Sequence, residues 1–256
     1  MARYDSLENM NALLDPMRAI LDAALAFVYP QVCQICRDER ATAEEGFVGA
    51  ECRATVRYIK PPFCARCGLP FEGAITSEFE CSNCQGQDWQ FSCARSVVVA
   101  RDKMLEVIHR YKYQRALWFE RFLGELLVTK ASPEVSAGGW KWIVPVPLHP
   151  VKQREREFNQ AERLARCLSR ASGVPLNRGL LRRTEPTRTQ TLLSRAERQA
   201  NVRHAFSMRS GRQLNGERIV LIDDLFTTGA TTGACARVLR EAGAGEVCVW
   251  TVARGV

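Results

Sequence analysis

Apolar and polar positions follow two different patterns along this chain, and the change falls near residue 90. Before it the sequence is rich in cysteine and turn residues, and after it short apolar runs alternate with helical periodicity. The pattern predicts strands at 96–100, 142–146, 219–222 and 246–252, and helices over 103–130, 159–172 and 232–242, the first of them broken around 112–115. Strands that alternate with helices indicate an α/β domain with a mainly parallel sheet.

The first thirty residues predict an amphipathic helix. Arg18 and Asp22 interrupt their most apolar stretch, which argues against membrane insertion. Acidic residues stand where a secretion signal carries a basic segment, so we expect a cytoplasmic protein. In that compartment cysteines stay reduced and tend to be metal ligands instead of disulfides.

Cysteines dominate the next segment. Seven of the 11 lie between Cys33 and Cys84, and six of these form the C-x-x-C pairs Cys33/Cys36, Cys64/Cys67 and Cys81/Cys84. Two such pairs separated by a short hairpin can place four thiolates tetrahedrally around zinc, and the last two pairs have that spacing. C-x-x-C is also a redox motif, but that motif expects a βαβ context, whereas these flanks resemble loops.

The first pair lacks a complete partner. Cys52 stands alone, because Gly49 occupies the position of its expected companion. Three interpretations stay open: a three-cysteine site completed by another residue such as Glu51, a degenerate site without metal, and a site lost through drift. We therefore divide the chain into a helix over 1–30, a zinc ribbon, single or double, over 31–90, and an α/β domain over 91–256.

The net charge of +8 and the pI near 9.1 favour anionic partners, either phosphate-bearing ligands or nucleic acid. The basic run from Arg101 to Arg121 contains Tyr111, Tyr113 and Trp118, which could stack on single-stranded bases. The alternative is an amphipathic helix that packs its aromatic residues into the core, and for Trp118 we favour that alternative.

The strongest chemical signal is the segment Ile219-Val-Leu-Ile-Asp-Asp-Leu-Phe-Thr-Thr-Gly-Ala-Thr231. Its apolar strand ends in two carboxylates that can accept hydrogen bonds from ribose hydroxyls, and its loop can hold a phosphate at a helix N-terminus. A Walker B strand would need an upstream Gly-x-x-x-x-Gly-Lys-Ser/Thr loop, which the chain lacks. A receiver domain would carry its acidic pair near its start. The predicted residues are Asp223, Asp224, Thr227, Thr228, Gly229, Ala230 and Thr231.

Two further segments fit an anionic ligand. The turn Pro145-Val146-Pro147 is followed by Lys152, Arg154 and Arg156, and strand ends of a parallel sheet bring this turn near Asp223. Farther along, residues 188–203 are rich in arginine, and we expect Arg195 to close over the ligand as part of a hood.

Together these segments resemble the ComF/GntX family of competence-type phosphoribosyltransferases. The resemblance runs from about Phe27 to the C-terminus and rests on Phe63-Cys-Ala-Arg-Cys-Gly-Leu-Pro70, Pro145-Val-Pro-Leu-His149, Phe158-Asn-Gln160, Leu193-Ser-Arg-Ala-Glu-Arg198, Asn201-Val202, Ala205-Phe206 and the Asp223 segment. It implies a double zinc ribbon before a type I phosphoribosyltransferase fold. Two departures stand out: Glu157 replaces a usual glycine, and Gly49 replaces a cysteine.

The resemblance also implies a ligand, phosphoribosyl diphosphate (PRPP), bound with Mg²⁺, and a link to DNA uptake. On this interpretation Asp223 and Asp224 hold the ribose, and Arg154 and Arg156 neutralise pyrophosphate with Mg²⁺. One hypothesis is a transferase that releases pyrophosphate from PRPP. The other is a non-catalytic factor that binds PRPP and single-stranded DNA and works with DNA-uptake proteins.

Overall fold

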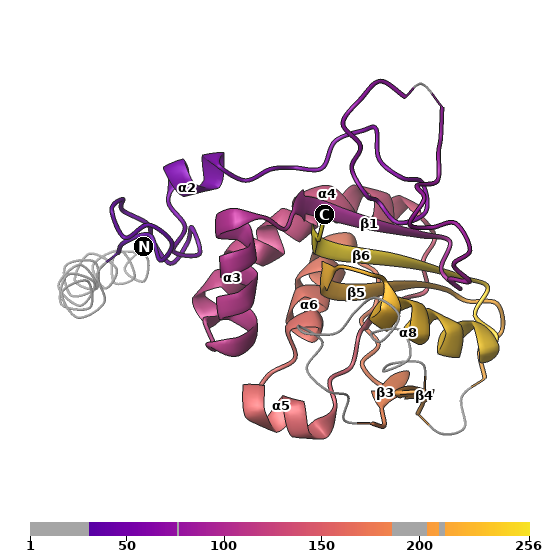
Figure 1. Ribbon diagram of the computed structural model, residues 1–256. Helices are drawn as coiled ribbons and strands as arrows, with labels where there is room; N and C mark the ends of the chain where they lie inside the picture. Colours follow the sequence, from indigo (N-terminus) through magenta and orange to yellow (C-terminus); the bar gives the residue numbers. More distant parts are fainter. Residues whose placement is uncertain (1–30, 76, 186–203, 210–212) are drawn as a thin grey trace, which may run out of the picture. The chain divides into compact units, whose positions relative to one another are not determined.

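Figure 1 shows the computed structural model, which describes residues 31–75, 77–185, 204–209 and 213–256. The chain divides into two compact units, Met1–Arg53 and Ala54–Val256. The second cysteine group therefore belongs to the same unit as the α/β domain. The helix predicted over 1–30 and the hood residue Arg195 lie outside the described residues.

A four-stranded parallel sheet forms the centre of the second unit (Figure 1). Its order is β1 (Cys93–Val99), β6 (Glu246–Arg254), β5 (Arg218–Phe226) and β2 (Trp142–Pro145). Every neighbouring pair in this sheet is parallel, as the alternation of strands and helices predicts. The central strands are mostly buried, because helices and loops cover both faces.

Helices α4 (Glu120–Ala137) and α6 (Gln160–Ser172) pack on one face of this sheet. Helix α8 (Ala230–Glu241) packs on the other face, together with the second cysteine group. The predicted break in the first helical stretch is present, since α3 (Asp102–Tyr113) ends before a short turn of 3₁₀ helix at Leu117–Phe119.

Local signals explain the ends of α6. The side chain of Asn159 accepts a hydrogen bond from the Ala161 backbone N–H at 3.0 Å, which caps the helix start. Gly173 closes the helix in the left-handed conformation, with φ of 75°. Both ends match the predicted helix within one residue.

Two elements depart from the predictions. Residues Pro150–Arg156 form helix α5, a segment for which we predicted no helix; Pro150 stands at the first helical turn, which tolerates proline. In addition, β3 (Leu181–Arg183) and β4 (Phe206–Met208) form a small antiparallel sheet that the sequence pattern does not predict. A short helix α2 (Ala50–Ala54) follows Gly49.

The aromatic residues around α3 also differ from the prediction. Tyr111 is fully buried, but Trp118 is 40% exposed and Tyr113 is 46% exposed. The expectation that Trp118 packs into the core is therefore wrong. Trp118 lies in the short 3₁₀ turn, where the neighbouring Phe119 is the buried side chain. Among the described residues no helix combines the length and apolarity that a membrane span requires.

Candidate functional site

A pocket of about 560 Å³ opens at the carboxyl ends of β5 and β2 in the second unit. This is the edge at which ligands bind in parallel α/β sheets. Most of the predicted ligand residues line it: Val146, Pro147, Arg156, Asp223, Asp224, Thr227, Thr228, Gly229, Ala230 and Thr231. Pro145, at the end of β2, and the exposed Arg154 are not among the lining residues.

The acidic pair lines the pocket. Asp224 is 3% exposed, and its Oδ1 atom pairs with the Lys112 ammonium at 2.9 Å. Its other oxygen, Oδ2, is buried and has no hydrogen-bond partner among the described residues. Burial alone would lower the pKa of Lys112, but the carboxylates of Asp224 and Asp223 outweigh that effect and raise it. Lys112 therefore stays charged.

Asp223 has a different electrostatic environment. Burial, and then the charge of the neighbouring Asp224, raise the pKa of Asp223 to about 7, although Lys112 acts in the opposite direction. Its Oδ1 atom accepts a hydrogen bond from the Asp224 backbone N–H at 2.9 Å. The two adjacent carboxyls therefore differ: one is tied to a lysine and the other titrates near neutral pH.

The loop after β5 places backbone N–H groups at the start of α8. Gly229 caps this helix with φ of 76°, a conformation that favours glycine. A side chain there would also meet Phe226 at 2.8 Å and Trp89 at 3.1 Å. The hydroxyl of buried Thr232 donates to the Gly229 carbonyl at 3.2 Å, which holds the first turn in place. This geometry suits an anion at the helix N-terminus.

Cations line the remaining walls. Lys152 and Arg156 come from α5, and the Arg156 guanidinium lies 4.7 Å from the centre of the Tyr113 ring. Arg183 comes from β3, and burial lowers the pKa of its guanidinium despite the nearby Asp223. With Lys112, these cations outnumber the two carboxylates, so the pocket favours a ligand that carries several negative charges.

Several lining residues were not predicted from the sequence as site residues: Lys112, Tyr113, Asn159, Gln160 and Arg183. Asn159 and Gln160 belong to the Phe158-Asn-Gln160 motif, so that motif was a usable signal. The Asn159 side chain donates to the Val146 carbonyl at 3.0 Å and so positions the turn after β2. Lys112 and Arg183 carry no local signal, because only the fold brings them to Asp223 and Asp224.

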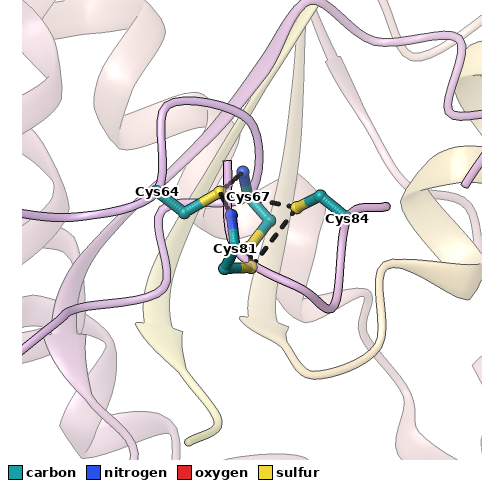
Figure 2. A group of neighbouring side chains, drawn as sticks. All are labelled: Cys64, Cys67, Cys81 and Cys84. Atoms are coloured by element: carbon teal, nitrogen blue, oxygen red, sulfur yellow. Dashed lines mark hydrogen bonds between the residues drawn. The ribbon is translucent and has the colours of Figure 1, made fainter. Parts of the chain in front are cut away.

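The second cysteine group has the geometry of a structural zinc site. Figure 2 shows the sulfur atoms of Cys64, Cys67, Cys81 and Cys84 converging from two loops. The sulfur–sulfur distances are 3.4 Å for Cys64–Cys84, 3.6 Å for Cys67–Cys81 and 3.5 Å for Cys81–Cys84. Four thiolates around one zinc ion lie about 3.8 Å apart, so the group fits the metal. Backbone N–H groups of Cys67 and Cys81 point at the Cys64 sulfur, at 3.5 and 3.3 Å.

Hydrogen bonds connect this second cysteine group, called the zinc group below, to the pocket loop from Thr227 to Thr231. Arg254, at the end of β6, is 4% exposed, and its guanidinium donates to the Cys67 carbonyl at 3.2 Å and to the Thr227 carbonyl at 2.7 Å. Trp89 stacks on Phe91 and meets Phe226 edge to face, directly beneath Gly229. The zinc group therefore supports the loop that forms one wall of the pocket.

The first cysteine group lies in the first unit. Cys33, Cys36 and Cys52 gather as predicted, and the fourth member is Glu39. Glu51, the residue suggested from the sequence, is not in the group. Its side chain is exposed, and its backbone N–H instead donates to Glu39 at 2.9 Å.

The fold and the site define a class of protein. A parallel α/β sheet whose central strand ends in an acidic pair and enters a threonine-rich loop at a helix N-terminus is the type I phosphoribosyltransferase fold, here preceded by cysteine groups of zinc-ribbon type. The double zinc ribbon domain family matches residues 24–85.

Comparison with curated proteins identifies the family. The chain is 31% identical to Competence protein F of Haemophilus influenzae, over 87% of this chain and 96% of that one. It is 32% identical to the DNA utilization protein YhgH of Escherichia coli, over 88% and 97%, and 32% identical to Competence protein ComFC of Bacillus subtilis, over 79% and 82%. The chain belongs to this ComF family of competence and DNA utilization proteins.

Solved structures give more distant matches. An allosteric regulatory enzyme of purine biosynthesis is 28% identical with a TM-score of 0.34, over 51% of this chain and 24% of that one. A purine phosphoribosyltransferase from Pyrococcus horikoshii is 14% identical with a TM-score of 0.34, over 52% and 83%. Because these scores are low, the fold assignment rests on the sheet and on the family.

Proposed function

We propose that this chain binds PRPP, or a related ribose phosphate, in the pocket at the ends of β5 and β2. One observation carries the proposal: an acidic pair, of which Asp224 is buried, comes directly before a threonine-rich loop that starts a helix, and both line one pocket with several cations. A diol, a phosphate and a pyrophosphate each need one of these three features.

Each part of the ligand has a partner in this arrangement. Asp223 and Asp224 accept hydrogen bonds from the ribose hydroxyls, since both line the pocket. The loop from Thr227 to Thr231 holds the 5′-phosphate. Arg156 and Lys152 also line the pocket and neutralise the pyrophosphate. Arg154, which we predicted for the same role, stays a prediction because it does not line the pocket.

Mg²⁺ fits the donor set at this site, since a carboxylate oxygen without a partner is a suitable ligand or water acceptor. When bound, it would supply further neutralisation of the pyrophosphate charge. Lys152 and Arg156 also neutralise part of the pyrophosphate charge.

The reaction that this site suits is phosphoribosyl transfer. The bond between C1 of the ribose and the pyrophosphate oxygen breaks, the electron pair leaves with pyrophosphate, and an acceptor adds to C1 through an oxocarbenium-like state. Such chemistry depends on positioning and charge stabilisation more than on a protein nucleophile. Lys112 offsets the negative charge of the two carboxylates, and Arg183 offsets the charge of the leaving pyrophosphate.

The pyrophosphate produced by this reaction can be measured directly. We expect release from PRPP in the presence of an acceptor from a panel of bases, and loss of that release in the variant Asp223→Asn/Asp224→Asn. Glu134→Gln, an exposed acid on α4, is the matched control. Ligand-dependent protection against thermal unfolding without pyrophosphate release would reject the transferase and retain the binding protein.

The names of the relatives lead us to propose a role in the uptake or use of DNA. A second candidate function, binding of single-stranded DNA, is favoured by the exposed Tyr113 and Trp118 beside the basic residues of α3. In that case binding weakens as salt rises and Trp118→Ala reduces affinity severalfold, whereas Tyr58→Ala, an equally exposed aromatic residue elsewhere, does not. Salt-independent binding, or equal effects of the two variants, would contradict it.

A further inference from the structure

The first cysteine group contains one residue that the zinc-ribbon pattern does not include. Cys33, Cys36, Cys52 and Glu39 each offer one ligand atom, and these atoms all lie within 4.8 Å of one another. Cys33 is fully buried and Cys52 is 2% exposed, so the sulfur atoms converge in the interior of this small unit. Carboxylate oxygens are among the ligands that zinc takes in proteins, beside histidine nitrogen and cysteine sulfur.

Glu39 occupies the space of the missing cysteine. A Cβ atom built on Gly49 would lie 2.2 Å from Cδ of Glu39 and 2.4 Å from its Oε2 atom. No side chain fits at residue 49 while Glu39 is in this position. Glycine at residue 49 and glutamate at residue 39 are therefore parts of one arrangement, in which the carboxylate takes the volume of a thiolate.

The surrounding backbone holds Glu39 in place. The Cys33 N–H donates to the Glu39 carbonyl at 2.8 Å, which fixes the backbone of Glu39 opposite the first cysteine. The Cys52 N–H donates to Oε1 at 3.0 Å, and the Glu51 N–H donates to Oε2 at 2.9 Å. Hydrogen bonds of this kind orient the ligands of metal sites. The Cys36 sulfur lies 3.6 Å from Oε1.

We propose that this group binds zinc through three thiolates and the carboxylate of Glu39, which replaces the lost cysteine. The ligands keep the formal charge of a four-cysteine site, because a carboxylate and a thiolate each carry one negative charge. Zinc binds a carboxylate oxygen less strongly than a thiolate, because thiolates are the softer ligands that this metal favours. The first site should therefore release zinc to a chelator before the group of Cys64, Cys67, Cys81 and Cys84 does.

Zinc content of the full chain provides the first test. We expect two zinc ions per chain in the wild type, one in each group. Glu39→Ala should contain one, and Glu39→Gln should bind the weaker zinc about tenfold less tightly or worse. Glu44→Ala, an exposed acid in the same loop, should keep both ions.

A swap separates ligand loss from misfolding. Gly49→Cys combined with Glu39→Ala removes the carboxylate, opens its space and restores a fourth thiolate, so it should recover two zinc ions. With Co²⁺ in place of zinc, the thiolate charge-transfer absorbance of the first site should rise by about one third over the wild type, since four thiolates replace three.

Three results would overturn the proposal. The first is a wild-type chain that holds only one zinc ion. The second is a Glu39→Ala variant that retains both ions with unchanged affinity. The third is a swap variant whose cobalt spectrum equals that of the wild type.

Discussion

Lys112 and Asp224 form an ion pair in the pocket, and neither side chain is more than 19% exposed. Removing the lysine leaves a buried carboxylate without its counter-charge, which costs far more than the pair contributes. We expect Lys112→Met to lower the free energy of unfolding by about 3 kcal/mol. Chemical denaturation measures this loss. Adding Asp224→Asn to Lys112→Met should recover most of the lost free energy of unfolding. A double variant no more stable than Lys112→Met alone would contradict the pairing.

Asp223 makes stability depend on pH. Its pKa in the folded chain is about 7, above the ordinary value of 3.8, so the folded chain holds a proton that the unfolded chain has already released. The free energy of unfolding should therefore fall as pH rises from about 4 to 7, and then level off. Asp223→Asn should remove that slope and stabilise the chain above pH 7 by about 1–2 kcal/mol. Urea titrations across this range give the answer, and an identical slope in the variant would contradict it.

At the scale of elements, helix α5 ends at Glu157 in the left-handed conformation, with φ of 67°. A residue other than glycine is strained there by about 1–2 kcal/mol. Its exposed ion pair with Arg115, at 2.8 Å, contributes little in return. Glu157→Gly should therefore raise the free energy of unfolding by about 0.5 kcal/mol, whereas Glu157→Ala, which keeps the strain and loses the pair, should not. Thermal unfolding of both variants decides this, and a stabilised Glu157→Ala would point to the charge instead.

Elements and site residues that depend on local signals could be predicted from the sequence, whereas those that depend on tertiary contacts could not. The main strands and α6 could be predicted from the sequence, because apolar runs and caps such as Asn159 and Gly173 are local signals. Helix α5 could not, since a proline at a first turn looks the same as one in a loop. In the candidate site, Asp223 and its loop form one contiguous segment that could be singled out from the sequence, and they line the pocket. Lys112 and Arg183 were missed, because each meets its partners only through tertiary structure. Glu39 lies only three residues from Cys36, but its contacts with residues 51 and 52 form through tertiary structure.

At the scale of the whole second unit, Arg254 connects the zinc group to the pocket loop. Its buried guanidinium bonds the Cys67 carbonyl on one side and the Thr227 carbonyl on the other. We expect Arg254→Met to weaken PRPP binding about tenfold and to speed zinc release from this group, because both partners lose a buried donor. Arg209→Met, an exposed arginine, is the control. If Arg254→Met sped zinc release but left PRPP affinity unchanged, Arg254 would stabilise the zinc group without affecting the ligand pocket, and the prediction would be wrong.

The central claim is that the pocket at Asp223 and Asp224 binds PRPP. Calorimetric titration of PRPP with Mg²⁺ into the zinc-loaded full chain tests it most directly. We predict saturable binding of one PRPP per chain, at least about tenfold weaker in Asp223→Asn/Asp224→Asn and unchanged in Glu134→Gln. A wild-type chain that gives no binding heat at several temperatures, or a double variant that binds as tightly as the wild type, would contradict the account.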